Sequence, residues 1–183
     1  MPGSKVVGVV ASSAGGVEEL RTGLVEPLLE AGHRVAVTLT PTAARWLDHL
    51  GETTKLAEVT GLPVRSEARL LGSSRPHPQV DVYAVAPATA NLVAKLALGI
   101  ADNQALTVLC EGVAGTPMVV FPRVNAAHAR HPAWASHLAT LRSVGVELVY
   151  GEDVWPLSEP RSSGPSRPLP WTEIQRRVEH LLG

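Results

Sequence analysis

Short, almost wholly apolar runs alternate with longer amphipathic stretches along most of the chain. Such runs, which lack polar alternation, are typical of strands that are buried on both faces of a sheet. Leucines that recur every four residues between them, such as Leu20, Leu24 and Leu28, predict helices packed on that sheet. The pattern predicts one α/β domain over residues 1–183, with a Rossmann-like, doubly wound parallel sheet. The predicted strands are residues 5–11, 34–40, 82–86, 116–122 and 146–150, with a short extra strand at 62–64.

The clearest unit is the strand, turn and helix between residues 80 and 99. We expect Pro87 to end the strand, because it has no N–H for a ladder hydrogen bond. Thr89 is a suitable N-cap for the helix that follows, and Asn91 falls in its first turn. The free backbone N–H groups at such a helix start suit an anion such as phosphate, although an ordinary β–α turn has the same pattern. One apolar face of the helix is predicted to hold Leu92, Leu96 and Ile100.

Two further β–α turns carry small polar residues. The first strand is followed by Ser12 and Ser13 in a loop of serine, alanine and glycine, and the second by Thr40 and Pro41, a natural N-cap and first helical residue. The first loop lacks the spacing of the dinucleotide-binding fingerprint, and a solvent-facing turn is the alternative interpretation. Because turns after parallel strands meet at one edge of the sheet, the three turns together predict a site for a phosphate-bearing cofactor.

Composition narrows the possible partners and compartments. The chain is 45% hydrophobic and 18% charged, with a net charge of -1, which does not indicate nucleic acid or an anionic membrane as a partner. No apolar run approaches the roughly 20 residues of a membrane span, and the first residues lead directly into a strand, so we expect a cytoplasmic protein without a signal peptide. A single cysteine, Cys110, excludes an internal disulfide and a multi-cysteine metal site, and we predict no metal.

Two sequence motifs resemble those of a known family. Residues 87–91 read Pro-Ala-Thr-Ala-Asn and residues 99–103 read Gly-Ile-Ala-Asp-Asn. They resemble the Pro-Ala-Ser/Thr-Ala-Asn-Thr and Gly-Ile-Ala/Cys-Asp-Asn motifs of the flavin-containing cysteine decarboxylases, which include phosphopantothenoylcysteine decarboxylase and the peptidyl-cysteine decarboxylases of lantibiotic biosynthesis. The resemblance extends from about Val6 to Tyr150, with Leu92 in the place of the motif's last threonine.

The resemblance implies that the cofactor is FMN and that the protein is a homo-oligomer built from trimers, either a trimer or a dodecamer, with flavin at a subunit interface. It also implies which side chains contact the flavin, since the second turn matches the family's Thr-Pro-x-Ala turn. The residues implied to bind the cofactor are Ser12, Ser13, Thr40, Thr42, Pro87, Ala88, Thr89 and Asn91.

The same resemblance points to two catalytic residues. His77 is the candidate for the family's active-site histidine, a base for a substrate thiol, although it lies about four residues closer to Pro87 than the family pattern has it. The alternative is a histidine in an exposed, proline-rich loop. Asn125 matches the asparagine of the family's Pro-x-Met-Asn motif, which helps to hold the substrate carboxylate; it is also a plausible helix N-cap.

The proline- and serine-rich residues 151–170 correspond to a flexible flap that closes over the substrate in the family. Ser162-Ser163-Gly164 resembles the flap of the peptide decarboxylases. The flap cysteine that serves the reductive half-reaction of phosphopantothenoylcysteine decarboxylase has no counterpart, because no cysteine follows Cys110. The resemblance therefore implies oxidative decarboxylation of a C-terminal peptidyl cysteine or a similar thiol carboxylate to an enethiol. Residues 171–182 form an amphipathic helix, either docked or at a subunit contact.

Two other functions remain open from the sequence. The displaced histidine, and Val124 in place of the methionine of the Pro-x-Met-Asn motif, are compatible with an FMN-binding structural or regulatory protein that has no decarboxylase activity. A flavin prenyltransferase-like enzyme is a further alternative, since that fold is related.

Overall fold

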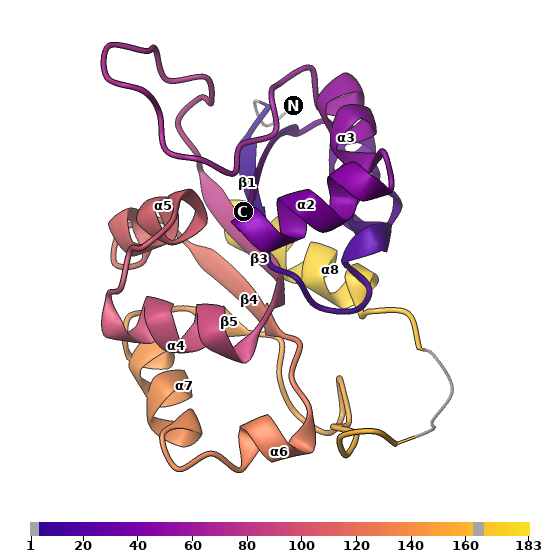
Figure 1. Ribbon diagram of the computed structural model, residues 1–183, viewed down its shortest axis with the longest axis vertical. Coiled ribbons are helices and arrows are strands. Elements are labelled where there is room, and N and C mark those ends of the chain that lie inside the picture. Colours follow the sequence, from indigo (N-terminus) through magenta and orange to yellow (C-terminus); the bar gives the residue numbers. More distant parts are fainter. Residues whose placement is uncertain (1–3, 163–166) are drawn as a thin grey trace.

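The computed structural model describes residues 4–162 and 167–183 and confirms the predicted Rossmann-like α/β fold. Five parallel strands form one sheet in the order β2-β1-β3-β4-β5 (Figure 1). Parallel neighbours need crossover connections, which the intervening helices provide. The strands are β1 (Val6–Ala11), β2 (Arg34–Leu39), β3 (Val82–Ala88), β4 (Met118–Pro122) and β5 (Glu147–Leu148).

Helices cover both faces of this sheet (Figure 1). One face packs against η1 (Val17–Glu19), η2 (Arg21–Val25), α1 (Glu26–Glu30), α2 (Pro41–His49), α3 (Glu52–Thr60) and α8 (Trp171–Leu182). The other face packs against α4 (Ala90–Leu98), α5 (Gln104–Gly112) and α7 (Trp134–Ser143), while the short α6 (Ala126–Ala129) follows β4.

The apolar runs are explained by this double cover. In β1, Val7 and Val9 point to the first core and Val10 to the second. In β3, Ala84 belongs to the first core and Val85 to the second. Both sides of each central strand are therefore buried, and the polar alternation of a half-exposed sheet is absent.

The strand at the centre of the sheet is longer than predicted. β3 continues through Pro87 to Ala88, and its pairing with β4 changes register between Val85 and Ala88. This irregularity accommodates a residue that lacks a ladder N–H, so the expectation that Pro87 ends the strand was wrong.

The helix after β3 is shorter than predicted. α4 ends at Leu98, because Gly99 adopts a left-handed conformation with φ of 70° and the Ile100 N–H donates to Lys95 O at 2.8 Å. Ile100 is 42% exposed and does not continue the apolar face. The next helix begins after Asn103, whose side chain caps it.

Three other segments differ from the sequence-based expectation. α3 was not predicted, because Leu56 is its single buried residue. The strand expected at 62–64 is reduced to a bridge between Thr38 and Arg65. The helix predicted from the spacing of Leu20, Leu24 and Leu28 is divided into η1, η2 and α1. A Cβ atom on Gly23 of η2 would lie 2.5 Å from the Trp171 ring, so glycine here allows α8 to pack closely.

Residues 151–162 and 167–170, which precede α8, contain no helix or strand. Trp155 is 5% exposed, and its ring meets the ring of Phe121 edge-on, with centroids 5.7 Å apart. Ile174 and Val178 bury one side of α8 in the first core. Ser163 and Gly164 of the predicted flap motif lie outside the described residues. Within the described part of the chain, no helix has the length and apolarity to cross a membrane.

Candidate functional site

Ser12 joins the turns after β1 and β3. Its hydroxyl donates a hydrogen bond to Pro87 O at 2.9 Å and accepts one from the Thr89 N–H at 2.8 Å. Its own N–H also donates to Pro87 O at 2.9 Å. Ser12 is only 2% exposed, so these bonds are made in a dry environment where an unpaired group is costly. Both Ser12 donors are engaged within the protein, and cofactor contact by Ser12 remains a prediction.

The threonines of the turns cap their helices as predicted. The hydroxyl of Thr40 accepts from the Ala43 N–H at 3.4 Å, and that of Thr89 accepts from the Leu92 N–H at 3.3 Å. The Thr42 hydroxyl, two residues after Thr40, accepts a hydrogen bond from the Arg45 guanidinium at 3.2 Å. Capping fixes the start of each helix at the carboxyl edge of the sheet.

The loop after β1 presents backbone donors. Among the residues that the structure describes, no acceptor faces the N–H groups of Ser13 and Gly15, and the Gly16 N–H donates to the Glu18 carboxylate at 2.9 Å. Asn91 is exposed in the first turn of α4, whereas Pro87 and Ala88 are buried in β3. Backbone N–H groups that are open at such a turn favour an oxyanion.

The two predicted catalytic residues line different cavities. His77 lines a cavity of about 430 Å³, and Asn125 lines one of about 470 Å³. The larger lies at the carboxyl edge, between the loop after β1 and the turn after β4, where its lining includes Gly15, Arg123, Asn125 and Trp155. The Arg123 N–H donates to Ala88 O at 2.8 Å and so connects this turn to the turn after β3. We call this space the edge cavity.

Asn125 caps α6 at the edge cavity. Its Oδ1 accepts a hydrogen bond from the His128 N–H at 3.0 Å, which confirms the capping interpretation. The side-chain NH2 group remains available as a donor, since capping uses only the oxygen. Capping and a contact to a substrate carboxylate are therefore compatible, and the second role remains a prediction.

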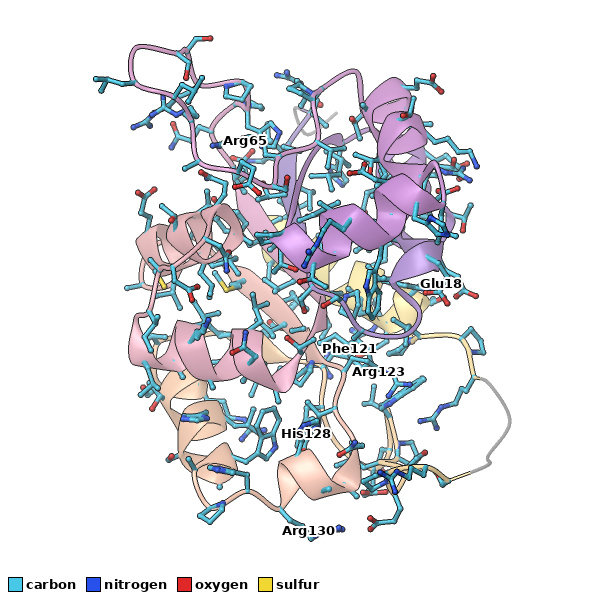
Figure 2. The ribbon with its side chains drawn as sticks, in the orientation of Figure 1. Glu18, Arg65, Phe121, Arg123, His128 and Arg130 are labelled. Atoms are coloured by element: carbon cyan, nitrogen blue, oxygen red, sulfur yellow. The ribbon has the colours of Figure 1, made fainter. Side chains whose placement is uncertain are left out.

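His77 lines the smaller cavity, which we call the face cavity. This cavity lies against the second face of β1 and β2, beside α5, with Thr38, Arg65 and Tyr83 in its lining. Figure 2 shows Arg65 near the loop at one end of the molecule and Arg123 toward the other end. None of the described residues lining the face cavity is Asn125 or one of the predicted cofactor contacts.

The environment of His77 favours its neutral form. Burial lowers the pKa of the imidazole, the nearby Arg65 lowers it further, and the contact with Pro63 O opposes them. Nε2 lies 2.7 Å from Pro63 O and must donate, because a carbonyl oxygen accepts only. The neutral ring therefore keeps Nδ1 as the atom that can take a proton.

The sequence-based prediction omitted Arg123, Trp155 and Arg167, which gather at the edge cavity. The arginine between Pro122 and Asn125 was visible in the motif region, but the two others lie in a proline-rich segment without a recognisable pattern. Within residues 4–162 and 167–183, no group of three or more histidine, cysteine, aspartate or glutamate side chains is placed to hold a metal ion. Burial raises the pKa of the Cys110 thiol, which packs against the second core.

Comparison with known proteins identifies the family. The sequence profile of the Flavoprotein family matches residues 2–182. The chain belongs to the Flavoprotein family. A relative from Mycobacterium tuberculosis, the coenzyme A biosynthesis bifunctional protein CoaBC, is 34% identical over 146 residues, which are 77% of this chain and 34% of the relative. The chain thus spans about a third of the length of this curated relative.

The alignments with solved structures of the same fold extend over nearly the whole chain of this flavoprotein. The FMN-dependent cysteine decarboxylase TvaF from thioviridamide biosynthesis has a TM-score of 0.70 and 23% identity, and the match covers 98% of this chain and 99% of that one. The FMN-binding protein AtHal3 has a TM-score of 0.69 and 19% identity, with 97% and 98% covered. At these identities the likeness establishes the fold.

Proposed function

We propose that this flavoprotein binds FMN and catalyses the oxidative decarboxylation of a cysteine-type thiol carboxylate, such as a C-terminal peptidyl cysteine. The observation that carries the proposal is the carboxyl edge, where hydrogen bonds from Ser12 and Arg123 hold the turns after β1, β3 and β4 together beside Asn125. Ligands of doubly wound folds bind at this edge. The likeness to FMN-dependent cysteine decarboxylases supports the chemistry.

The residues at this edge fit a phosphate-bearing flavin. Ser13 and Gly15 offer backbone N–H groups, and the edge cavity adds the guanidinium of Arg123. Thr40, Thr42, Pro87, Ala88, Thr89 and Asn91 complete the proposed contacts from the neighbouring turns. FMN, when bound, supplies a two-electron oxidant that accepts hydride from the substrate Cβ.

The protein side chains hold the proton and the carboxylate. Nδ1 of neutral His77 takes the thiol proton, so that loss of hydride from Cβ leaves a thioaldehyde. The thioaldehyde loses CO2 readily because the sulfur system accepts the electron pair of the broken bond. The enethiolate that this leaves takes the proton back from His77 Nδ1, and the product is an enethiol. The NH2 group of Asn125 donates to the carboxylate or to the adjacent amide. No cysteine after Cys110 is present to return the electrons to the product.

In a homo-oligomer, the face cavity of one chain and the edge cavity of another can form one site. His77 and Asn125 line different cavities of one chain, so they act on one substrate when two copies each contribute one residue. We propose an assembly of trimers with the flavin between copies, in which the face cavity of one chain lies against the edge cavity of the next.

Anaerobic mixing of the FMN-loaded protein with a cysteine-ending peptide tests the reaction. We expect bleaching of the flavin absorption and release of CO2, with no change for the same peptide ending in serine. His77→Asn and Asn125→Ala are expected to abolish bleaching. Absence of bleaching with cysteine-ending peptides and with phosphopantothenoylcysteine contradicts the proposed reaction.

Co-assembly of two inactive variants tests the shared site. If each site takes His77 from one chain and Asn125 from another, mixing His77→Asn and Asn125→Ala chains in equal amounts before assembly restores about a quarter of the wild-type rate, by random pairing at each interface. A mixture that stays as inactive as its components contradicts a site shared in this way.

A second candidate function is FMN binding without decarboxylation. The observation that favours it is the engagement of His77 Nε2 by Pro63 O, away from the predicted cofactor residues. Under this alternative the protein takes up FMN, but no thiol carboxylate reduces it, and His77→Asn leaves FMN affinity unchanged.

A further inference from the structure

Two arginines pack on one buried indole at the edge cavity. The guanidinium carbon of Arg167 lies 3.6 Å from the centroid of the Trp155 ring, and that of Arg123 lies 5.0 Å from it. Edge-on contact with Phe121 helps to fix the indole. The cation–π contacts hold both cations in place, but they do not neutralise their charges.

Neither guanidinium has a carboxylate partner. Among the residues that the structure describes, no aspartate or glutamate lies within ion-pair distance of Arg123 or Arg167, and residues 1–3 and 163–166 contain no acidic residue. Arg167 donates to Pro156 O at 2.9 Å. The Arg123 Nε is buried and has no hydrogen-bond partner within the described residues. A buried guanidinium donor without an acceptor is costly.

The acidic residues around the edge cavity are engaged elsewhere. Glu159 forms a two-pronged ion pair with Arg130, at 2.6 and 2.9 Å. Glu18 accepts from the Gly16 N–H, and Glu19 accepts from the Trp171 indole N–H at 3.3 Å. Figure 2 shows Arg130 and Glu18 on different sides of Arg123. Among the described residues, the two arginines on Trp155 thus have no carboxylate partner, and neither does the exposed Arg161 in the same lining.

Burial and the charge of Arg167 both lower the pKa of Arg123, burial being the larger cause. Two like charges thus lie close together on one indole, on the half-buried Arg123 and the exposed Arg167. An anion between them would relieve this repulsion and would give the Arg123 Nε an acceptor.

We propose that Arg123, Trp155 and Arg167 form an oxyanion-binding slot next to Asn125, which takes a phosphate or a carboxylate group. The planar guanidinium matches both anions, since each offers two oxygens to parallel N–H donors. Two sources carry this chemistry: the phosphate of FMN and an acidic group of the substrate beyond its reacting carboxylate. The slot itself stands independently of the reaction, whereas the choice between the two sources rests on the proposed function.

Titration of inorganic phosphate into the purified protein, followed by calorimetry, tests the slot directly. We expect saturable binding that weakens about tenfold or more in Arg123→Gln and in Arg167→Gln, through loss of charge-assisted hydrogen bonds. Arg142→Gln, an exposed position on α7, is the matched control and should bind as the wild type does. Equal binding by all four proteins, or no binding by the wild type, overturns the proposal.

Arg123→Lys separates the slot from a structural role of Arg123. Lysine keeps the charge but loses the fork, so partial phosphate binding with an unchanged melting temperature supports the slot. If Arg123→Gln and Arg123→Lys both melt early and Arg167→Gln binds phosphate normally, Arg123 is structural and the proposal is wrong.

Two further titrations identify the source of the anion. If the slot holds the cofactor phosphate, Arg123→Gln weakens FMN binding about tenfold or more but leaves riboflavin binding unchanged. If it holds the substrate, Arg123→Gln raises the KM for a cysteine-ending peptide with an acidic neighbour, and the KM for the corresponding neutral peptide does not change. If the protein does not turn over any peptide, only the KM comparison is lost, because phosphate binding and FMN binding are measured without turnover.

Discussion

The edge cavity and the face cavity both contain arginines, yet they are built differently. At the edge, three turns are bonded to one another through Ser12, Pro87 and Arg123. At the face, the lining segment is attached to β2 by the backbone of Arg65, and His77 is held by one contact to Pro63 O. Geometry at the edge is therefore fixed by strands and caps, while geometry at the face depends on a loop. Under the proposed function, a neighbouring chain therefore completes the site of the base on that loop.

Removal of the Ser12 hydroxyl, which connects the turns after β1 and β3, is expected to have the largest effect on stability. Ser12→Ala leaves the part-buried Thr89 N–H without its acceptor and removes a bond to Pro87 O, so we expect a loss of about 3 kcal/mol in unfolding free energy, measured by urea denaturation. Ser13→Ala, in the same loop and with no hydroxyl hydrogen bond among the described residues, is the control and should change stability little. Equal stability of the two variants would show that the hydroxyl does not hold the turns together.

Filling the floor of the face cavity gives the next largest effect. A Cβ atom at Gly8 would lie 2.7 Å from the Tyr83 ring, so Gly8→Ala pushes the ring into the cavity and costs about 2 kcal/mol by overpacking. Gly15→Ala meets nothing within 4 Å and serves as the control at the edge. Urea midpoints measure both changes. A Gly8→Ala protein as stable as Gly15→Ala would mean that the Tyr83 ring moves freely.

Asn125 variants separate capping from substrate binding. Asn125→Ala loses the cap of a four-residue helix and should cost about 1 kcal/mol of unfolding free energy. Asn125→Asp keeps an acceptor for the His128 N–H, so stability is retained, but it places a negative charge where we propose the substrate carboxylate. We expect Asn125→Asp to raise the KM strongly while its urea midpoint stays near that of the wild type. Normal kinetics for Asn125→Asp would leave Asn125 with the capping role alone.

The smallest effect concerns the protonation of His77. Burial lowers its pKa from the ordinary 6.5, so the unfolded chain takes up the proton first as the pH falls. The contribution of His77 to stability is complete above pH 6.5 and decreases as the pH falls toward the lower native pKa. His77→Asn should therefore flatten the change in urea midpoint across this window. Identical pH profiles of the two proteins would contradict a half-buried, neutral His77.

The contrast also explains what the sequence could reveal. The strands were predictable because their runs are buried on both faces, and Thr40 and Thr89 were predictable caps because the capping bond is local. α3 was missed since one buried leucine makes no periodicity. The prediction that the strand ends at Pro87 was wrong because a register shift lets the strand continue past this residue.

The slot was beyond prediction from local patterns. Arg123 follows β4, whereas Trp155 and Arg167 lie in irregular chain that folds back on it. Only tertiary packing brings such distant residues together. The position of His77 was equally inaccessible, because the path of a proline-rich loop is set by contacts that no short pattern encodes.

The most direct test of the account is the visible absorption spectrum of the purified protein, with the released cofactor identified by mass. If FMN binds at the carboxyl edge of the sheet, the spectrum shows the bands of oxidised flavin and the protein releases FMN. Ser12→Ala is expected to reduce the amount of FMN released more than Ser13→Ala does. A colourless protein that takes up no FMN on reconstitution would contradict this account, and the decarboxylase proposal would then have no oxidant.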